Sequence, residues 1–174
     1  MGIEIERKFL LADASWRAHV ASSTAMAQGY LTDAAALEQG LARASVRVRV
    51  AGASAWLNIK SITLGIARAE FEYPLPLADA QTLLRDLCRG TVEKTRHRVD
   101  VDGHVFEIDE FDGDNAGLIV AELELPAVDA PFPRPAWLGK DVSHLSRYYN
   151  VSLIDHPFCQ WSAAERVGKG DSCC

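Results

Sequence analysis

Charged residues recur along the chain in short sets whose members stand two positions apart. These sets are Glu4-x-Glu6-x-Lys8, Arg47-x-Arg49, Asn58-x-Lys60, Arg68-x-Glu70-x-Glu72, Lys94-x-Arg96, Glu107-x-Asp109 and Glu122-x-Glu124. Residues two apart on a β-strand lie side by side on one face, and like charges in that position repel each other unless a cation or a partner compensates. A site that binds a charged ligand would supply that compensation.

The sets contain both halves of a site for metal and phosphate. Hard divalent cations such as Mg²⁺ prefer carboxylate oxygens and shared phosphate oxygens, which makes Glu4, Glu6, Glu122 and Glu124 candidate ligands. Arg and Lys neutralise phosphate and stabilise the charge on a transferring phosphoryl group. A single such strand is usually just solvated on its polar face. The recurrence of the pattern along the chain favours a charged lining that faces inward.

The other conspicuous residues predict no separate site. The five histidines show no paired spacing, and the four cysteines form no CxxC pair. Neither a zinc site nor a disulfide framework is therefore predicted, and a reducing cytoplasm fits best. Trp56, Trp137 and Trp161 are interpreted as packing residues.

Alternation of apolar and polar residues predicts about eight strands, most of them joined as sequential hairpins. The predicted strands are residues 3–10, 24–32, 44–50, 56–62, 66–74, 91–99, 101–111 and 118–125. Apolar residues near the helical period predict an amphipathic helix over residues 77–88 that covers the apolar outer face of the sheet. A brief helix is predicted over residues 16–20, and another over residues 144–149 with Ser143 as its cap.

This pattern predicts a mainly β (α+β) fold, a closed eight-stranded antiparallel β-barrel, or tunnel, with a few flanking helices. At 174 residues and 19.0 kDa the chain is expected to form one domain. We assign residues 1–160 to that domain and residues 161–174 to a C-terminal tail.

The net charge of −6 argues against binding to a nucleic-acid duplex, which needs a clustered basic surface. It does not exclude a small polyanion bound by basic residues inside a cleft. No stretch approaches the roughly 18–20 apolar residues that span a bilayer, so no membrane association is predicted.

The opening Glu4-Ile-Glu6-Arg-Lys8 resembles the ExExK signature of the CYTH superfamily, the triphosphate tunnel metalloenzymes. The similarity covers residues 2–150. In the family's order follow Gln28-Gly29-Tyr30-Leu31, Arg47 and Arg49, Lys60, Arg68 to Glu72, Glu93-Lys94-Thr95-Arg96, Asp109 and Glu122-Leu-Glu124. A late segment, Trp137-Leu-Gly-Lys-Asp-Val-Ser, is also similar, although the family commonly has Glu where Asp141 stands.

The resemblance implies hydrolysis of a triphosphate bound along the tunnel, with Mg²⁺, or alternatively Mn²⁺, as the metal. The implied metal ligands are Glu4, Glu6, Glu122 and Glu124, with Asp109 and Glu72 helping to hold a second metal or to orient water. The implied phosphate contacts are Lys8, Arg47, Arg49, Lys60, Lys94 and Arg96. Arg68 has two open interpretations, a phosphate contact and an internal salt bridge.

No Ser, Cys or His nucleophile is required, because a metal-bound or carboxylate-oriented water can attack the terminal phosphorus. The residues expected to act in catalysis are Glu4, Glu6, Lys8, Lys94 and Asp109. Short members of the family that begin in this way resemble inorganic tripolyphosphatases, which release pyrophosphate and orthophosphate. The lack of an obvious aromatic clamp near the basic strands also favours an inorganic substrate.

Two alternatives stay open. The first is a nucleoside or thiamine triphosphatase or a class IV-type adenylate cyclase, and the second is a non-catalytic polyphosphate-binding module. A monomer or weak homodimer is expected, since a closed sheet needs no partner strand.

Overall fold

The computed structural model describes the backbone of residues 2–61 and 67–169. Within those ranges the side chains of residues 2–4, 34, 38, 67 and 68 lie outside the description. The predictions made for the side chains of Glu4 and Arg68 therefore fall outside the described residues.

Nine antiparallel strands make up one sheet in the described part of the chain. They are β1 (Gly2–Leu11), β2 (Val20–Tyr30), β3 (Ala44–Ala51), β4 (Ser54–Ser61), β5 (Ala67–Leu75), β6 (Thr91–Val101), β7 (His104–Phe111), β8 (Ile119–Glu124) and β9 (Leu138–Asp141). The helices are α1 (Ala34–Glu38), α2 (Leu77–Asp86), α3 (Ser152–Asp155) and α4 (Ala163–Arg166). Four 3₁₀ turns complete the elements: η1 (Ser15–His19), η2 (Gly113–Asn115), η3 (Ser146–Tyr148) and η4 (Phe158–Gln160).

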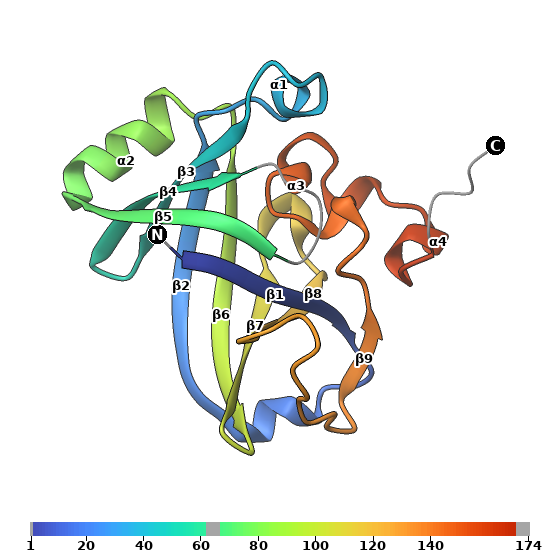
Figure 1. Cartoon of the computed structure of the whole chain (residues 1–174). Coiled ribbons are helices and arrows are strands. Elements are labelled where there is room, and N and C mark those ends of the chain that lie inside the picture. The colour runs from blue at the N-terminus through green and yellow to red at the C-terminus, as the bar shows by residue number, and fades with distance from the viewer. Residues whose placement is uncertain (1, 62–66, 170–174) are drawn as a thin grey trace.

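The strands follow the order β5-β4-β3-β2-β6-β7-β8-β1-β9, and β1 also pairs with β5 (Figure 1). One edge of β1 pairs with β8 from Glu6 to Leu10. Its other edge pairs first with β5, from Gly2 to Ile5, and then with β9, at Phe9 and Leu11. The first strand in sequence therefore joins three parts of the sheet.

The predicted mainly β architecture with few helices is confirmed, but the predicted strand count is wrong. β9 is the additional strand. It follows a proline-rich run and is only four residues long, so its sequence shows too little alternation to predict it. Its extended backbone comes from pairing with β1.

The helix predicted over residues 144–149 is also wrong, because the structure has only the short 3₁₀ turn η3 there. Ser143 does not cap a helix, since its hydroxyl lies within hydrogen-bond distance of Asp141 and of the backbone of Lys8. The predicted helices at α2 and η1 are present.

Two apolar clusters lie on the outer side of the sheet, where helices and loops cover them. Ala80 of α2 packs on Val48 and Ala55, and α2 runs along the outside of β3 and β4 (Figure 1). A larger cluster around Phe9 and Phe106 is closed by the segment after β8. Covering the outer face in this way leaves the middle of the inner face to polar residues.

A third apolar cluster lies on the inner face at one end of the sheet. Phe111 and Val120 of this cluster lie on the same strand faces as Asp109 and Glu122, and they pack with Tyr148 from the C-terminal segment.

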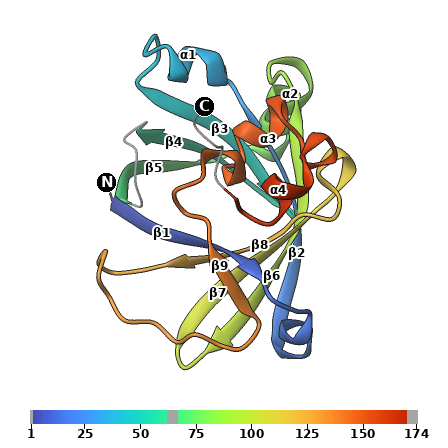
Figure 2. The same ribbon diagram turned by 90° about the vertical axis from the view of Figure 1, so that its right-hand side faces the viewer.

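The two ends of the molecule differ. α1 and α3 lie toward one end, and the β6–β7 hairpin and η1 lie toward the other (Figure 2).

Residues 161–169 pack against the rest of the chain. Trp161 is buried against Tyr148 and Phe158, and the hydroxyl of Tyr148 donates to the carbonyl of Glu165. The domain boundary at residue 160 stays a prediction.

None of the helices in the described ranges combines the length and apolarity needed to cross a membrane.

Candidate functional site

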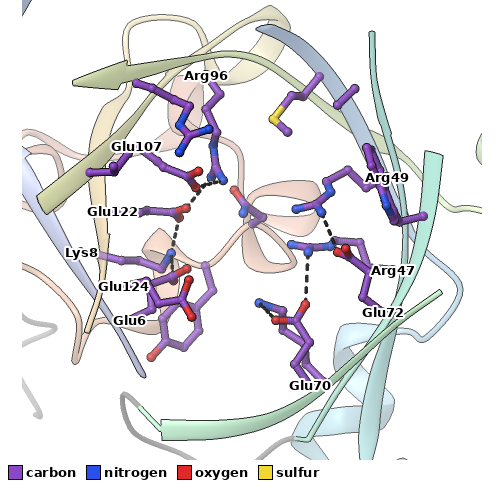
Figure 3. A pocket seen from close by; sticks show the side chains of 18 of the residues that line it. Glu6, Lys8, Arg47, Arg49, Glu70, Glu72, Arg96, Glu107, Glu122 and Glu124 are labelled. Carbon is purple, nitrogen blue, oxygen red and sulfur yellow. Dashed lines mark hydrogen bonds and ion pairs between the residues drawn. The ribbon is translucent and has the colours of Figure 1, made fainter. Parts of the chain in front are cut away.

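A cavity of about 710 Å³ occupies the inner side of the sheet. Its lining comes from β1 through β8, apart from residues of the β6–β7 turn, of the segment after β8 and of the stretch between η3 and α3. Figure 3 shows charged side chains from opposite parts of the sheet pointing into it. Alternation along each strand places these side chains inward and the apolar residues around Phe9 and Val48 outward.

The described lining carries equal numbers of basic and acidic side chains. The basic ones are Lys8, Arg47, Arg49, Lys60, Arg96 and Arg98, and the acidic ones are Glu6, Glu70, Glu72, Glu107, Glu122 and Glu124. They are arranged as two walls. We call the β1, β6, β7 and β8 side the acidic wall and the β3, β4 and β5 side the basic wall.

Lys8 lies at the centre of the acidic wall. Its ammonium forms an ion pair with Glu122, and its Nζ lies 2.6 Å from Glu6 Oε1. Burial alone would lower the pKa of Lys8, but the carboxylates of Glu122 and Glu6 outweigh burial and raise it. Burial would likewise raise the pKa of Glu122, and the charges of Lys8 and Arg96 hold it well below its ordinary value. Both groups are therefore charged at neutral pH.

Arg96 connects this pair to the rest of the acidic wall. Its guanidinium donates through Nε and Nη2 to the two oxygens of Asp109, each at 2.7 Å, and through Nη2 to Glu122 at 2.5 Å. It also forms an ion pair with Glu107. Strand register explains the pairing, because Arg96 lies opposite Asp109 in the β6–β7 ladder.

The basic wall has its own internal counter-ions. Arg49 Nη2 donates to Glu72 at 2.7 Å, and Glu70 lies 3.7 Å from Arg47 and 3.5 Å from Lys60. A fully buried Asn58 donates through Nδ2 to both glutamates, at 3.0 Å to Glu70 and 2.6 Å to Glu72. This amide holds the two carboxylates against the cations.

The positive charge of Arg49 is nevertheless only partly compensated by its surroundings. Burial and the neighbouring positive charge of Arg47 lower the pKa of Arg49, and Glu72 offsets this only in part. The Nε groups of Arg47 and Arg49 are buried without a hydrogen-bond acceptor. Two adjacent guanidiniums with unused donors are suited to an anion that brings several oxygens.

Lys94 and Asp109, both expected to act in catalysis, do not line the cavity. They are 2% and 0% exposed and form an ion pair with each other next to Arg96. Burial lowers the pKa of Lys94, and the charge of Asp109 opposes this without cancelling it. In this arrangement Asp109 is a counter-ion for two cations.

The structure brings together on the cavity most of the residues predicted from the sequence. They are Glu6, Lys8, Arg47, Arg49, Lys60, Glu72, Arg96, Glu122 and Glu124. The proposed metal ligand Glu72 lies on the basic wall, across the cavity from Glu6 and Glu124 (Figure 3). Among the side chains that the structure describes, no three His, Cys, Asp or Glu residues converge closely enough to hold a metal ion. Glu4, which belongs to the predicted ligand set, is not among them.

The predicted site lacked several residues that line the cavity, and Glu70, Glu107 and Trp56 are the most informative of them. Glu70 and Glu107 carry the same spacing of two as their predicted neighbours, and this signal was sufficient to find them. Trp56 was interpreted as a packing residue, but it lines the cavity with the Arg49 guanidinium 5.2 Å from its ring centre. An aromatic ring therefore lies beside a basic strand, and the argument against an organic substrate loses its basis.

An inner face with paired arginines opposite clustered carboxylates defines a class of proteins that bind a polyanion inside an antiparallel sheet. The comparisons with known proteins give the family. The CYTH domain matches residues 2–156, and the chain belongs to this family.

Two curated relatives are named inorganic triphosphatase. One, from Acetivibrio thermocellus, is 36% identical over 159 residues, which cover 91% of this chain and 97% of the relative. The other, from Nitrosomonas europaea, is 32% identical over 153 residues, which cover 86% and 95%.

Solved structures agree with this family. The crystal structure of an inorganic triphosphatase aligns with a TM-score of 0.60 at 31% identity, covering 88% of this chain and 95% of that one. A candidate adenylyl cyclase from Hippeastrum, described as having a dominant triphosphatase activity, aligns with a TM-score of 0.56 over 71% and 80% of the two chains. Its identity of 17% supports the fold alone.

Proposed function

We propose that this protein hydrolyses inorganic tripolyphosphate to pyrophosphate and orthophosphate with the help of Mg²⁺. The observation that carries the proposal is the pair of opposed charged walls in one cavity. Relatives named inorganic triphosphatase, which this chain matches over almost their whole length, support the same reaction.

We also infer that the sheet closes into an eight-stranded tunnel, with β9 attached outside the ring. What supports closure is the pairing of β1 with β5, in which Gly2 stands opposite Glu70 and Ile5 opposite Ala67. Such a tunnel would enclose the reacting phosphate and limit its contact with water.

The basic wall is the proposed binding surface for the phosphates. Arg47, Arg49 and Lys60 face the cavity from adjacent strands, and the first two have unused donors. Phosphate oxygens would replace Glu70 and Glu72 as partners of these cations. Binding would then draw on charge-assisted hydrogen bonds already aimed at the ligand.

The charge of the cavity fits a bound divalent cation. Because the described lining has as many carboxylates as basic groups, a polyanion that enters gains little net attraction unless a cation comes with it. Glu6, Glu122 and Glu124, together with Glu4, would hold the metal on the acidic wall. Bound there, Mg²⁺ would neutralise charge on the phosphate chain and lower the pKa of a coordinated water.

The protein's own groups would supply position and charge. Lys8 and Arg96 hold Glu122 ionised and fixed, so the acidic wall needs little rearrangement during the reaction. On the opposite side the guanidiniums would hold the phosphate that is not attacked. Hydrolysis by direct attack of water then requires no covalent intermediate.

The reaction is tested by measuring phosphate release from tripolyphosphate, ATP and thiamine triphosphate, each with and without Mg²⁺. We expect tripolyphosphate with Mg²⁺ to give the highest kcat/KM and one orthophosphate per molecule. Production of cyclic AMP from ATP as the main reaction would disprove the proposal. Tight binding of tripolyphosphate without turnover would instead favour a binding module.

The acidic wall is tested by Glu124→Gln, which keeps the shape and removes the charge. Loss of a metal-binding carboxylate should reduce turnover by at least about a hundredfold while the protein stays folded. Glu93→Gln is the matched control, since Glu93 lies exposed on β6 and does not line the cavity. Full activity of Glu124→Gln would remove the metal assignment.

A further inference from the structure

Glu6, Arg7 and Lys8 lie on β1 between its described pairings with β5 and with β9. Among the described residues, pairing with β5 covers Gly2 to Ile5, and pairing with β9 begins at Phe9. The backbone of Lys8 is held by the residues that follow β9: its carbonyl accepts from the N–H of Val142 at 2.8 Å, and its N–H donates to the hydroxyl of Ser143 at 2.9 Å. A side-chain oxygen is therefore the acceptor for the N–H of Lys8.

The hydroxyl of Ser143 is oriented for this task. It has one proton, and the carboxylate oxygen Oδ1 of Asp141 lies 2.6 Å away, whereas the alternative acceptor, the carbonyl of Lys8, lies at 3.5 Å. Donation to Asp141 leaves an oxygen lone pair free to accept from Lys8. Asp141 is itself fixed, because its Oδ2 accepts from Arg7 Nη1 at 3.1 Å and its Oδ1 also accepts from the N–H of Ser143 at 2.9 Å.

The same segment also reaches the side chain of Lys8. Tyr149 donates through its hydroxyl to the carbonyl of Ser143 at 2.9 Å, and the Lys8 ammonium lies 5.9 Å from the centre of the Tyr149 ring. Ser143 is only 8% exposed, so water does not readily replace its hydroxyl. Lys8 is therefore held at its backbone by Ser143 and approached at its ammonium by Tyr149.

We propose that Ser143, oriented by Asp141, is a positioning residue that fixes the Glu6–Lys8 stretch of β1 for the reaction. This inference rests on the proposed function. Ser143 does not line the cavity and would act through Lys8 and Glu6. A small displacement of reacting groups can cost as much as about a hundredfold in rate, so a single hydrogen bond at this point matters for turnover.

The test compares three substitutions of Ser143 in the full chain. Ser143→Ala removes the hydroxyl, Ser143→Val removes it and adds bulk, and Ser143→Thr adds the same bulk but keeps the hydroxyl. We expect Ala and Val to lower kcat for tripolyphosphate about tenfold, with KM changed less than about threefold because the basic wall is untouched. Thr should stay within about threefold of the wild type in both constants. Melting curves confirm that each variant is folded at the assay temperature.

The outcomes separate the two proposals. Equal kcat in all four proteins, or Thr as slow as Val, overturns the positioning role, because activity would then not follow the hydroxyl. If the wild type releases no phosphate from tripolyphosphate, the proposed function fails. Amide hydrogen exchange at Lys8 then decides the inference: protection in wild type and Thr with rapid exchange in Val supports the positioning of Lys8, and equal exchange in all of them overturns it.

Discussion

Arg96 is the residue through which the charges of the acidic wall are connected. Its guanidinium contacts Asp109, Glu107 and Glu122, three carboxylates that would repel one another without it. Burial opposes its charge, yet the pKa of Arg96 is raised well above its ordinary value by Asp109 and Glu122. Arg suits this position because its planar fork donates to several acceptors at once, which a lysine cannot do in the same geometry.

Asp109 acts as a counter-ion in this network, and Asp109→Asn tests that assignment. The substitution removes the carboxylate partner of the buried Lys94 and one of the carboxylate partners of Arg96, so we expect a loss of about 3–5 kcal/mol in the free energy of unfolding. Chemical denaturation measures this loss. Asp112→Asn, at an exposed position, should change it by less than about 0.5 kcal/mol. A tenfold or larger rise in the Mg²⁺ concentration needed for half-maximal turnover, with little loss of stability, would instead make Asp109 a metal ligand.

The pKa of Glu122 predicts how stability responds to acid. The folded-state pKa of Glu122 is held below its unfolded value of about 4.3 by Lys8 and Arg96. Its stabilising effect is therefore complete above that unfolded pKa and is lost as the pH falls further. We expect Glu122→Gln to unfold more easily at pH 7, by about 3–5 kcal/mol, and to approach the wild type below about pH 4. Denaturation curves from pH 7 to pH 3 measure the difference.

Glu107→Gln is the control for that experiment. Glu107 also pairs with Arg96, but its side chain is 37% exposed, so its loss should cost less than about 1 kcal/mol. A difference between wild type and Glu122→Gln that does not change with pH would contradict the linkage.

Residue type and spacing were sufficient to predict which side chains face inward, because strand alternation is local. Partners were not predictable. The contact of Arg96 with Asp109 depends on the register between β6 and β7, and the contact of Lys8 with Glu122 depends on β1 pairing with a strand more than a hundred residues later. Trp56 shows the same limit, since its position on the inner face was readable from alternation with Asn58 and Lys60 but its size suggested packing.

Among the strands and helices, those with a regular pattern of apolar and polar residues could be predicted from the sequence. β3, β4 and α2 have long, regular periods and lie close to their predicted bounds. β9 and η3 have no such regular pattern, because their conformations come from contacts with β1 and the core. The stretch Gln28-Gly29-Tyr30, which resembles the family's sequence, is also explained by the packing of these elements.

Gly29 is required where β2 passes the segment after α2. A Cβ at position 29 would lie 2.8 Å from Cβ and Sγ of Cys88 and 3.0 Å from the carbonyl oxygen of Gly90. Gly29→Ala should therefore destabilise the protein by about 1–3 kcal/mol. In the double variant with Cys88→Gly the two closest contacts are gone, so we expect the two substitutions to couple favourably by at least about 0.5 kcal/mol. Strict additivity in a double-mutant cycle of unfolding free energies would show that the contact with Cys88 is not the cause.

The distribution of charge over the whole molecule would account for the metal requirement proposed above. The net charge of the chain is −6, while the described cavity lining is balanced between acidic and basic groups. A triphosphate must therefore approach an acidic protein and enter a cavity whose cations already have carboxylate partners. A divalent cation that accompanies the substrate would remove both obstacles.

This balance predicts that removing a carboxylate from the basic wall makes metal-free binding tighter. Glu72 is the most suitable position, because it is the partner of Arg49 and its side chain is 41% exposed. In Glu72→Gln the amide oxygen can still accept from Asn58, while Arg49 loses its counter-ion and becomes available to phosphate. We expect the Kd for tripolyphosphate without divalent ions to fall about tenfold, measured by calorimetry at constant ionic strength.

Glu93→Gln removes the same charge from the outer surface and should leave that Kd unchanged, which separates the local effect from the change in net charge.

Glu72 was also predicted as a ligand of a second metal, and Glu72→Gln distinguishes the two roles. A counter-ion gives tighter metal-free binding and retained Mg²⁺-dependent turnover. A metal ligand gives unchanged metal-free binding and a large loss of turnover, and that result would show that the basic wall takes part in holding the metal.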